Sequence, residues 1–290
     1  MRRQAVNYGV SESRKDQTKT GSVFRVATFN LENYLDATAK KGCAKSPESK
    51  AKIRETIWAI NPDVIALQEI GSTDTLLELR ASLAAEKFDF PHWEYVSGAD
   101  TDLHVAILSK FPFGARRPHT EDSYTLNGQA FRVRRGFADV VVRVNSRFSF
   151  TLFAAHLKSK NENAEAGADA LRLEEARLLR DKIEARMKKT PDARILVCGD
   201  FNDAKNSRVV RSIAGVGKGR LIDTRPVDKT GKVAWTNYYE DMARHERIDY
   251  VLMSPAMAEC YLPEKSGLCE ISGWRLASDH RPVVAAFAAS

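Results

Sequence analysis

The sequence lacks the features that would place it among membrane or repeat proteins. No run of 18 or more apolar residues occurs in its 290 positions, so no segment is expected to span a membrane. It has no internal repeat, and no stretch rich in proline or glycine divides it. With 43% hydrophobic and 29% charged residues, it has the composition of a globular chain with a large core.

Charge of one sign is only slightly in excess. The formal net charge is +7, and the first 20 residues contribute five basic and two acidic side chains to it, which leaves a mild basic bias elsewhere. That bias is compatible with a polyanionic partner but does not establish one. Residues 1–21 are polar and predict a disordered or extended tail. They contain no apolar h-region, so no signal peptide is expected in the chain as given, and a processed secreted or periplasmic protein is still compatible with it.

The cysteines are few, four in all, and they leave the redox compartment open. Cys198 lies in an apolar run and is expected to be a reduced core residue. Cys260 and Cys269 are spaced to close a short loop in an oxidising environment, although spacing alone does not bring two Cα atoms together. Cys43 has no obvious partner.

What is present is an alternation of strand and helix patterns. Hairpins mixed with strands that are separated by helices predict one α/β domain over residues 22–290, with mixed rather than all-parallel sheets. Strands are expected at 23–30, 64–69, 104–110, 136–144, 148–157, 194–200, 247–253 and 281–287, and helices at 48–60, 74–85 and 169–189.

Polar residues stand at or near the ends of these strands. In α/β sheets ligands bind at strand ends, because side chains there emerge from the core into a crevice. Five or six strands that carry such residues are hard to explain as turn chemistry alone. The residues are Asn30, Glu69, His156, Asp200, Asn202, Asp249, Asp279 and His280.

Taken singly, most of these residues also have a structural interpretation. Asn30 suits a strand-to-turn boundary, and Glu69 could be an exposed carboxylate. The segment 199–203, GDFND, has the composition of an Asx turn. His156 follows an apolar run and could be a core histidine bonded to a backbone carbonyl. None of the four identifies a site by itself.

Asp249 is different, because it interrupts the strand pattern RIDYVLM. A buried carboxylate needs a partner to offset its desolvation. His280 is the natural candidate, since a carboxylate that fixes the tautomer of an imidazole and stabilises its protonated form recurs in catalytic sites. Such a pair can orient or deprotonate an attacking water.

The remaining polar residues favour a hard cation. Clustered carboxylate and amide oxygens, without cysteine or a second histidine at ligand spacing, suit Mg²⁺ or Mn²⁺ better than zinc. An ion on Glu69 would polarise a phosphoryl oxygen. Arginines at 132, 134 and 135 can supply bidentate contacts to phosphate. The chemistry implied is hydrolysis of a phosphoester by in-line attack of water.

Six short motifs together resemble a known superfamily. Although each motif is weak alone, they occur in the order and with the approximate spacing of the endonuclease/exonuclease/phosphatase superfamily, and the resemblance runs from about residue 23 to 288. The motifs are TFN at 28–30, DVIALQE at 63–69, HLKS at 156–159, GDFN at 199–202, RIDYVL at 247–252 and SDHRPV at 278–283.

This resemblance implies a deoxyribonuclease I-like fold, a four-layer αββα sandwich of two mixed β-sheets packed face to face. It also implies a divalent metal, Mg²⁺ or Mn²⁺, with Ca²⁺ as a possible structural ion. Glu69 then corresponds to a metal ligand, with Asn30 and Asp279 beside the metal and Asn30 also near the phosphate. His280 corresponds to the motif histidine that is paired with Asp249.

The same resemblance assigns the phosphate contacts. It places Asp200 and Asn202 against the phosphate and the attacking water, and makes His156 a phosphate contact or proton donor. Arg135 corresponds to a phosphate-contacting arginine, although its neighbour Arg134 could serve instead.

The substrate is less well defined by the sequence. A nuclease acting on nucleic acid is the leading hypothesis, and a phosphatase or phosphodiesterase acting on small-molecule or lipid phosphoesters with the same residues is the alternative. No obligate protein partner is evident. Trp235 and the pair Tyr238 and Tyr239 could stack on a base, but packing is the favoured interpretation because aromatic residues are large apolar groups first.

Overall fold

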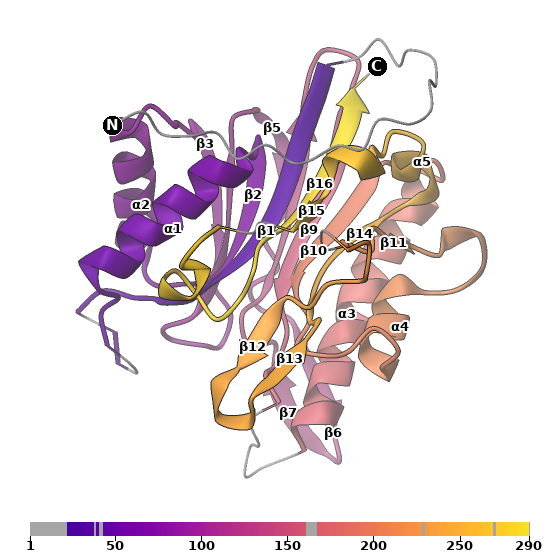
Figure 1. The fold of residues 1–290 in the computed structure, drawn as a ribbon. Coiled ribbons are helices and arrows are strands. Elements are labelled where there is room, and N and C mark those ends of the chain that lie inside the picture. Colours follow the sequence, from indigo (N-terminus) through magenta and orange to yellow (C-terminus); the bar gives the residue numbers. More distant parts are fainter. Residues whose placement is uncertain are drawn as a thin grey trace.

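Two β-sheets form the centre of the protein (Figure 1). The computed structural model describes residues 22–37, 39–40, 43–160, 167–227, 230–268 and 271–289. The expected tail at 1–21 and Cys269 lie outside these residues, so the structure describes neither the tail nor a pairing of Cys269 with Cys260.

The first sheet has the strand order β15-β16-β1-β2-β4-β3. Its strands β1 and β2 are parallel and the other neighbours are antiparallel, so the sheet is mixed as expected. The strands span Ser22–Tyr34 (β1), Val64–Ile70 (β2), His92–Val96 (β3), His104–Ser109 (β4), Gly267–Leu268 (β15) and Val283–Ala289 (β16).

The second sheet has the order β11-β14-β10-β9-β8-β5 and is mixed in the same way. Here β9 and β10 are the parallel pair. The strands span Phe113–Arg116 (β5), Phe137–Arg143 (β8), Ser149–His156 (β9), Ile195–Asp200 (β10), Ile222–Asp223 (β11) and Asp249–Met253 (β14).

Helices cover the outer face of each sheet. Figure 1 shows α1 and α2 on one side of the molecule and α3 and α4 on the other. The short helix α5 follows β14. The helices span Pro47–Ile60 (α1), Thr73–Ala85 (α2), Ala168–Lys189 (α3), Arg208–Ala214 (α4) and Pro255–Ala258 (α5).

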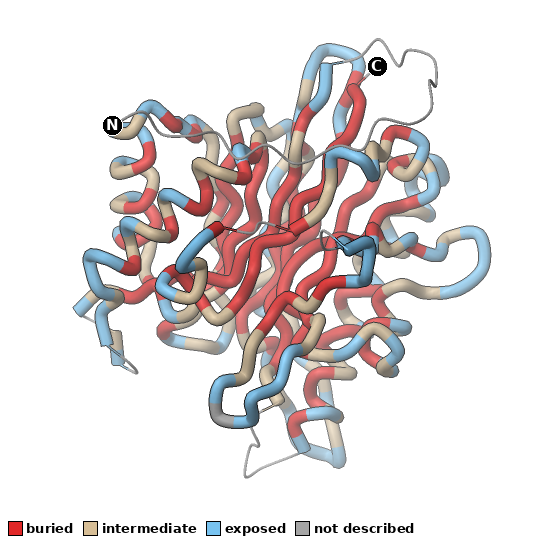
Figure 2. Tube along the Cα trace, viewed as in Figure 1, coloured by how far each residue is buried: buried red, intermediate tan, exposed pale blue. Residues whose placement is uncertain are grey.

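Three apolar clusters hold the layers together, and they account for the buried interior in Figure 2. One lies between the sheets, where Phe24 of β1 stacks on Phe150 of β9 with ring centroids 5.5 Å apart. The second joins the first sheet to α1 and α2, and the third joins the second sheet to α3 and α4. Because successive strand residues point to opposite faces, long strands such as β1, β2, β9 and β10 each supply two clusters. The predicted four-layer αββα sandwich is therefore confirmed.

Two hairpins extend from the sandwich. One joins β6 (Ser123–Leu126) to β7 (Gln129–Arg132), and the other joins β12 (Asn237–Tyr239) to β13 (Arg244–Glu246). Both were missed by the sequence patterns, as were the short strands β3, β5, β11 and β15 and the helices α4 and α5. Short, partly exposed elements have too few apolar positions to show a period. Among the described residues, no helix is long and apolar enough to cross a membrane.

Candidate active site

Three neighbouring strands of the second sheet place three ionisable residues in one row. In the strand register Asp200 of β10 lies opposite His156 of β9 and opposite Asp249 of β14. All three are buried, with at most 2% of their surface exposed. Residues 44 and 49 positions away from Asp200 in the chain thus become its direct neighbours, at the end of the sheet where the sequence predicted a site.

A glycine permits this row to form. Gly199, next to Asp200, has a φ of +137°, and a Cβ built on it would lie 1.8 Å from the carbonyl oxygen of Ala155. No side chain fits at that distance, and the conformation itself disfavours any residue with a Cβ. The GDFN motif therefore begins with glycine because β10 must approach β9 closely just before Asp200.

The first sheet supplies Asn30 from β1 and Glu69 from β2. The amide Nδ2 of Asn30 donates to Asp200 Oδ2 at 3.0 Å and to Glu69 Oε1 at 3.2 Å. Its Oδ1 accepts the backbone N–H of Glu32 at 3.0 Å. Asn30 is fully buried and connects the polar ends of the two sheets. The turn interpretation of this residue is therefore insufficient, because its side chain bridges to a residue 170 positions away.

Glu69 stands at an irregularity in its strand. Its φ is +60°, and the pairing of β2 with β4 shifts register between Gln68 and Ile70. A left-handed conformation is uncommon for a residue other than glycine and clusters at functional sites. Glu69 Oε2 accepts the backbone N–H of Asn33 at 2.9 Å, while Oε1 lies 3.8 Å from His156 Nε2. The carboxylate is thus directed into the cluster.

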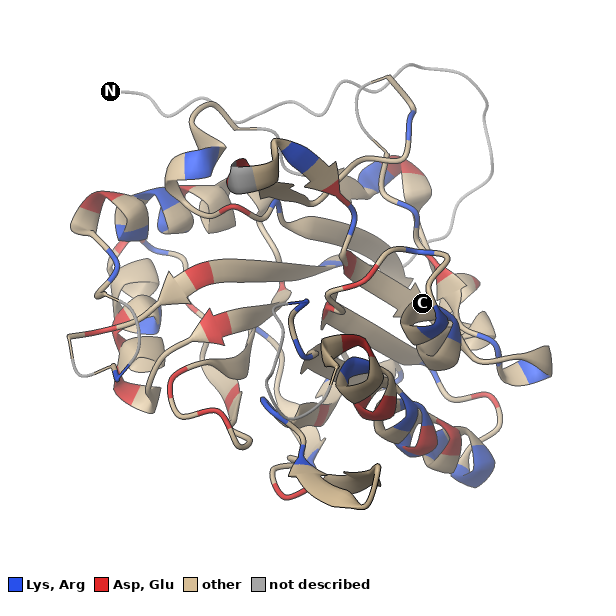
Figure 3. Ribbon diagram, turned by 90° about the horizontal axis from the view of Figure 1, so that it is seen from below, with Lys and Arg blue, Asp and Glu red and all other residues tan. Residues whose placement is uncertain are grey.

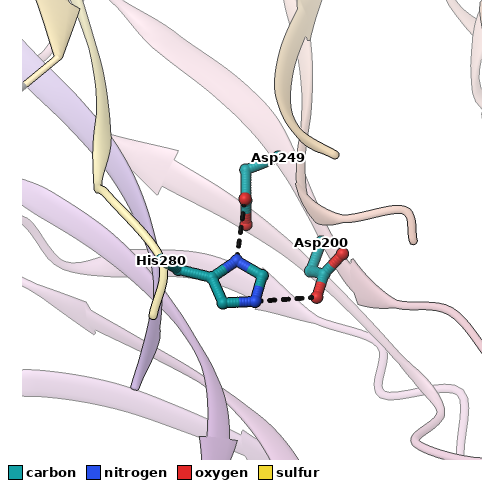
Figure 4. A group of neighbouring side chains, drawn as sticks. All are labelled: Asp200, Asp249 and His280. Atoms are coloured by element: carbon teal, nitrogen blue, oxygen red, sulfur yellow. Dashed lines mark hydrogen bonds and ion pairs between the residues drawn. The ribbon is translucent and has the colours of Figure 1, made fainter. Parts of the chain in front are cut away.

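His280 and Asp249 form the pair that the sequence predicted (Figure 4). His280 Nδ1 lies 2.8 Å from Asp249 Oδ2, and its Nε2 lies 3.8 Å from both Asp200 Oδ2 and Asp279 Oδ1. Burial acts to lower the pKa of His280, but the carboxylates of Asp249, Asp200 and Asp279 outweigh it and raise the pKa well above 6.5. The ring is therefore held in its protonated form at neutral pH.

His156 has the opposite electrostatic environment. Burial, followed by the positive charges of Arg135 and His280, lowers its pKa well below 6.5. Its Nε2 lies 3.6 Å from Asp200 Oδ2. Its buried Nδ1 has no hydrogen-bond partner within the described part of the chain. The two histidines of the cluster thus differ in charge near pH 7, one neutral and one cationic.

Negatively charged groups crowd around Asp200. Burial and the neighbouring Asp249 raise its pKa, and Glu69 adds to the effect, although His280 and the backbone N–H of Asn202 oppose it. A carboxyl group that is destabilised by other carboxylates is an environment that favours a bound cation. The donor set of the cluster therefore fits a divalent metal.

Two parts of the cluster offer positions for such an ion. Asp200, Asp249 and His280 present ligand atoms that all lie within 4.8 Å of one another. In that group, however, Nδ1 of His280 already bonds Asp249. The carboxylate of Glu69 is the other position, and Asn30 beside it now presents its amide nitrogen, so its oxygen would have to turn toward an ion. Oxygen ligands at both positions suit Mg²⁺ or Mn²⁺.

Asn202 and Arg135 meet at a backbone carbonyl next to His156. Asn202 Nδ2 donates to the carbonyl oxygen of Leu157 at 3.0 Å, and Arg135 donates to the same oxygen at 3.3 Å. The backbone N–H of Asn202, whose φ is +53°, donates to Asp200 Oδ1 at 2.8 Å. Both predicted phosphate contacts therefore lie at the cluster. Arg132 lies away from it, in β7, and pairs with Glu121 on the surface at 2.7 Å.

The sequence patterns did not identify Glu175, a buried residue that orders the backbone near Arg135 and His156. Glu175 of α3 is fully buried, and its two oxygens accept the backbone N–H groups of Arg134 at 2.9 Å and Lys158 at 2.7 Å. It thereby fixes the backbone directly before Arg135 and two residues after His156. A signal existed in the sequence, because Glu175 lies four residues from Leu171 and four from Leu179, on the apolar stripe of the helix.

The aromatic residues before Asp249 pack on histidine, tryptophan and basic side chains. Trp235 contacts His245 with ring centroids 4.3 Å apart and Trp274 at 5.3 Å, and the guanidinium of Arg281 lies 4.3 Å from its ring centre. Protein groups therefore surround Trp235, in agreement with the packing interpretation. The hairpin that carries these rings is tied to the site, since Tyr238 donates its backbone N–H to the carbonyl oxygen of Asp279 at 3.0 Å.

The layered fold, the acidic cluster and the pair of His280 with Asp249 define a hydrolase of phosphoric esters that depends on a divalent metal. The sequence pattern of the Endonuclease/Exonuclease/phosphatase family matches residues 27–280, and the chain belongs to this family. The predicted superfamily and fold are thereby confirmed.

The chain is similar in fold to solved structures of proteins from several organisms. A truncated TDP2 from Caenorhabditis elegans has a TM-score of 0.64 at 18% identity, covering 92% of this chain and 98% of that one. Sphingomyelinase C from Streptomyces griseocarneus has a TM-score of 0.58 at 19% identity, covering 92% and 99%. The human Nocturnin catalytic domain, solved with a sulfate anion, has a TM-score of 0.63 at 18% identity, covering 92% and 94%. No curated protein matches the chain by sequence.

Proposed function

We propose that this protein is a nuclease that hydrolyses phosphodiester bonds of nucleic acid by in-line attack of an activated water. Asp249 orients His280, and His280 together with Asp200 and Asn202 positions the water and the phosphorus centre. Neutral His156 is placed to donate a hydrogen bond to a phosphate oxygen.

Within this proposal Glu69 holds the divalent metal, with Asn30 and Asp279 beside it. When bound, the ion supplies electrophilic stabilisation of the charge that develops on the phosphoryl oxygens. Asn30 maintains the spacing between Glu69 and Asp200, since it donates to both carboxylates. Arg135 adds a contact to the phosphate from the other side, where its guanidinium is held by the carbonyl oxygen of Leu157.

The observation that carries the nucleic-acid assignment is the crowding of three cations beside His156. Arg134, Arg135 and Lys158 lie close enough that, after burial, the two arginines are the largest cause of the lowered pKa of Lys158. Like charges gathered in this way favour a polyanion. On the long helix α3, by contrast, Lys and Arg alternate with Asp and Glu (Figure 3).

A substrate panel tests this proposal. The purified protein is incubated with Mg²⁺ or Mn²⁺ and with plasmid DNA, linear DNA, RNA, bis(p-nitrophenyl) phosphate and p-nitrophenyl phosphorylcholine. We expect nucleic acid to be cleaved with the highest kcat/KM. If nucleic acid stays intact with every metal while a small phosphoester is hydrolysed, the nuclease assignment is wrong. The protein is then a small-molecule or lipid phosphoesterase. Hydrolysis that survives in both Glu69→Ala and His280→Ala would show that the site lies elsewhere.

A further inference from the structure

A cavity of about 560 Å³ opens beside the proposed reaction centre. Arg135 and Asn33 line it, and both also belong to the centre: Arg135 bonds the carbonyl oxygen of Leu157, next to His156, and Asn33 donates its backbone N–H to Glu69. The cavity therefore begins where the proposed scissile phosphate lies and extends away from it. Its volume lies in the range of ligand sites.

Charged residues of both signs line the cavity, and each of its carboxylates accepts hydrogen bonds from the protein. The lining residues are Glu32, Asn33, Cys43, Lys45, Asp100, Asp102, Leu103, Arg134 and Arg135.

Each carboxylate has its oxygens occupied. Asp100 Oδ1 accepts the backbone N–H groups of Asp102 and Leu103, and its Oδ2 accepts from Arg134 at 2.9 Å. Asp102 accepts from the backbone of Lys40 and from Thr101.

Glu32 is engaged in the same way. Its two oxygens accept from Arg275 at 3.0 and 3.1 Å, and Oε2 lies 3.8 Å from Lys45 Nζ. The negative charge of Glu32 is therefore balanced by two cations of the protein, Arg275 and Lys45.

The arginines contribute positive charge to the cavity. The side chain of Arg134 is 38% exposed, and it pairs with Asp100 through one nitrogen at 2.9 Å. Arg135 is only 6% exposed, and its Nε lies 3.6 Å from the same carboxylate. Arg134 is therefore the arginine that a ligand in the cavity can reach.

Lys45 adds a second buried charge to the same cavity. Its side chain is 8% exposed, and Nζ donates to the carbonyl oxygen of Glu32. Burial lowers the pKa of this ammonium group, whereas the carboxylates of Glu32, Asp279 and Glu69 act in the opposite direction. This ammonium lines the cavity and interacts electrostatically with both Asp279 and Glu69, so it lies near the proposed metal position. Burying an ammonium group costs desolvation free energy. Binding of an anion at this position would offset that cost.

We propose that this cavity binds a second phosphate group of the substrate, adjacent to the scissile one, through Lys45 and Arg134. The inference rests on the proposed function and narrows its substrate class to phosphodiesters that carry a neighbouring phosphate. We expect a choline-like quaternary ammonium to bind less well at the same place, since Lys45 and Arg134 repel it.

Dinucleotides that differ by one phosphate test the proposal. Thymidylyl-thymidine is compared with its 5′-phosphorylated and 3′-phosphorylated forms in the presence of Mg²⁺, and kcat/KM is measured for each. In the wild-type protein we expect one phosphorylated form to exceed the unphosphorylated one about 10- to 100-fold, the range expected for hydrogen bonds to a charged group. In Lys45→Met this ratio should fall toward 1, and in Lys45→Arg it should be largely restored.

A matched control distinguishes the loss of a lysine in the cavity from the loss of a positive charge elsewhere on the protein. Lys50→Met also removes one lysine from an ion pair, with Glu78 at 3.0 Å, but on α1 and outside the cavity. We expect it to keep the wild-type ratio. Arg134→Met should lower the ratio from the other side of the cavity. Thermal unfolding of each variant shows whether it is folded, and a ratio of two substrates is insensitive to the fraction of active protein.

Three results would overturn the proposal. These are a wild-type ratio near 1 for both phosphorylated forms, a ratio unchanged in both Lys45→Met and Arg134→Met, and a preference for p-nitrophenyl phosphorylcholine. If no dinucleotide is cleaved but bis(p-nitrophenyl) phosphate is, the nuclease function fails instead. The same three dinucleotides are then compared as inhibitors of that hydrolysis, and equal inhibition constants would overturn the second-phosphate site as well.

Discussion

Replacing Asp249 by asparagine removes the negative charge that faces His280 while keeping the size of the side chain. The two groups are 2.8 Å apart and nearly completely buried, so solvent screens their interaction little. A hydrogen bond between charged groups contributes about 1.5–3 kcal/mol, and one pKa unit corresponds to about 1.36 kcal/mol. The substitution should therefore lower the pKa of His280, with a loss of about 1.5–3 kcal/mol of preference for the protonated ring.

The assay is the pH dependence of kcat/KM with bis(p-nitrophenyl) phosphate. If His280 accepts a proton from water, activity rises with pH as the ring loses its own proton. The rising limb of the wild-type profile should then lie well above pH 6.5, as the raised pKa of His280 requires. In Asp249→Asn the limb should move to lower pH, and the maximal rate should fall on the order of 10²- to 10⁴-fold because the ring is no longer oriented.

Stability gives an independent check with a defined sign. A histidine whose pKa is raised by folding stabilises the protein fully below its unfolded pKa, and this contribution disappears as pH rises through the folded pKa. The difference in unfolding free energy between the wild type and Asp249→Asn should thus be largest below about pH 6.5. Asp139→Asn is the control: Asp139 is equally buried and pairs with Arg117 at 2.7 Å on β8. It should lower stability without moving the pH profile. An unmoved limb in Asp249→Asn would refute the reasoning.

Other predictions concern the supports of the site. Gly199→Ala should prevent correct folding, because its Cβ would lie 1.8 Å from a carbonyl oxygen, whereas Gly167→Ala, with open space around it, should change the unfolding free energy by less than about 1 kcal/mol in chemical denaturation. Glu175→Gln should lower the unfolding free energy by about 1–3 kcal/mol and reduce kcat/KM, because an amide nitrogen would face one of two backbone N–H groups. An unchanged kcat/KM would contradict the role of Glu175 in fixing Arg135. EDTA should abolish hydrolysis and Mn²⁺ or Mg²⁺ should restore it, while Glu69→Gln should lose the metal-dependent rise in melting temperature measured by fluorimetry.

The layers of the fold could be predicted because each long strand carries an apolar run and each long helix an apolar stripe. Strand β2 is buried along most of its length and α3 runs for 22 residues, so their patterns survive in the sequence. The hairpins could not be predicted in this way. Strand β12 has three residues and β6 alternates between exposed and half-buried positions, which is too little to distinguish a strand from a loop.

The residues of the site could be predicted from the sequence, but their arrangement in space could not. Asp249 was identified because a carboxylate within a strand requires a partner, and the structure provides His280. Lys45 gave no signal, since a lysine in a polar segment is ordinarily solvated, and its burial depends on Glu32 and on the loop around it. Glu175 could have been recognised by its place on the apolar face of α3, but which backbone groups it accepts from depends on tertiary contacts.

A crystal soaked with Mn²⁺ and phosphate tests the central claim most directly, since anomalous scattering locates the ion. The account predicts one Mn²⁺ bonded to a carboxylate oxygen of Glu69, with the phosphate between this ion and the side chains of His156, Asn202 and His280. An ion bound only by Asp200, Asp249 and His280, or a phosphate that does not touch the metal, would contradict it.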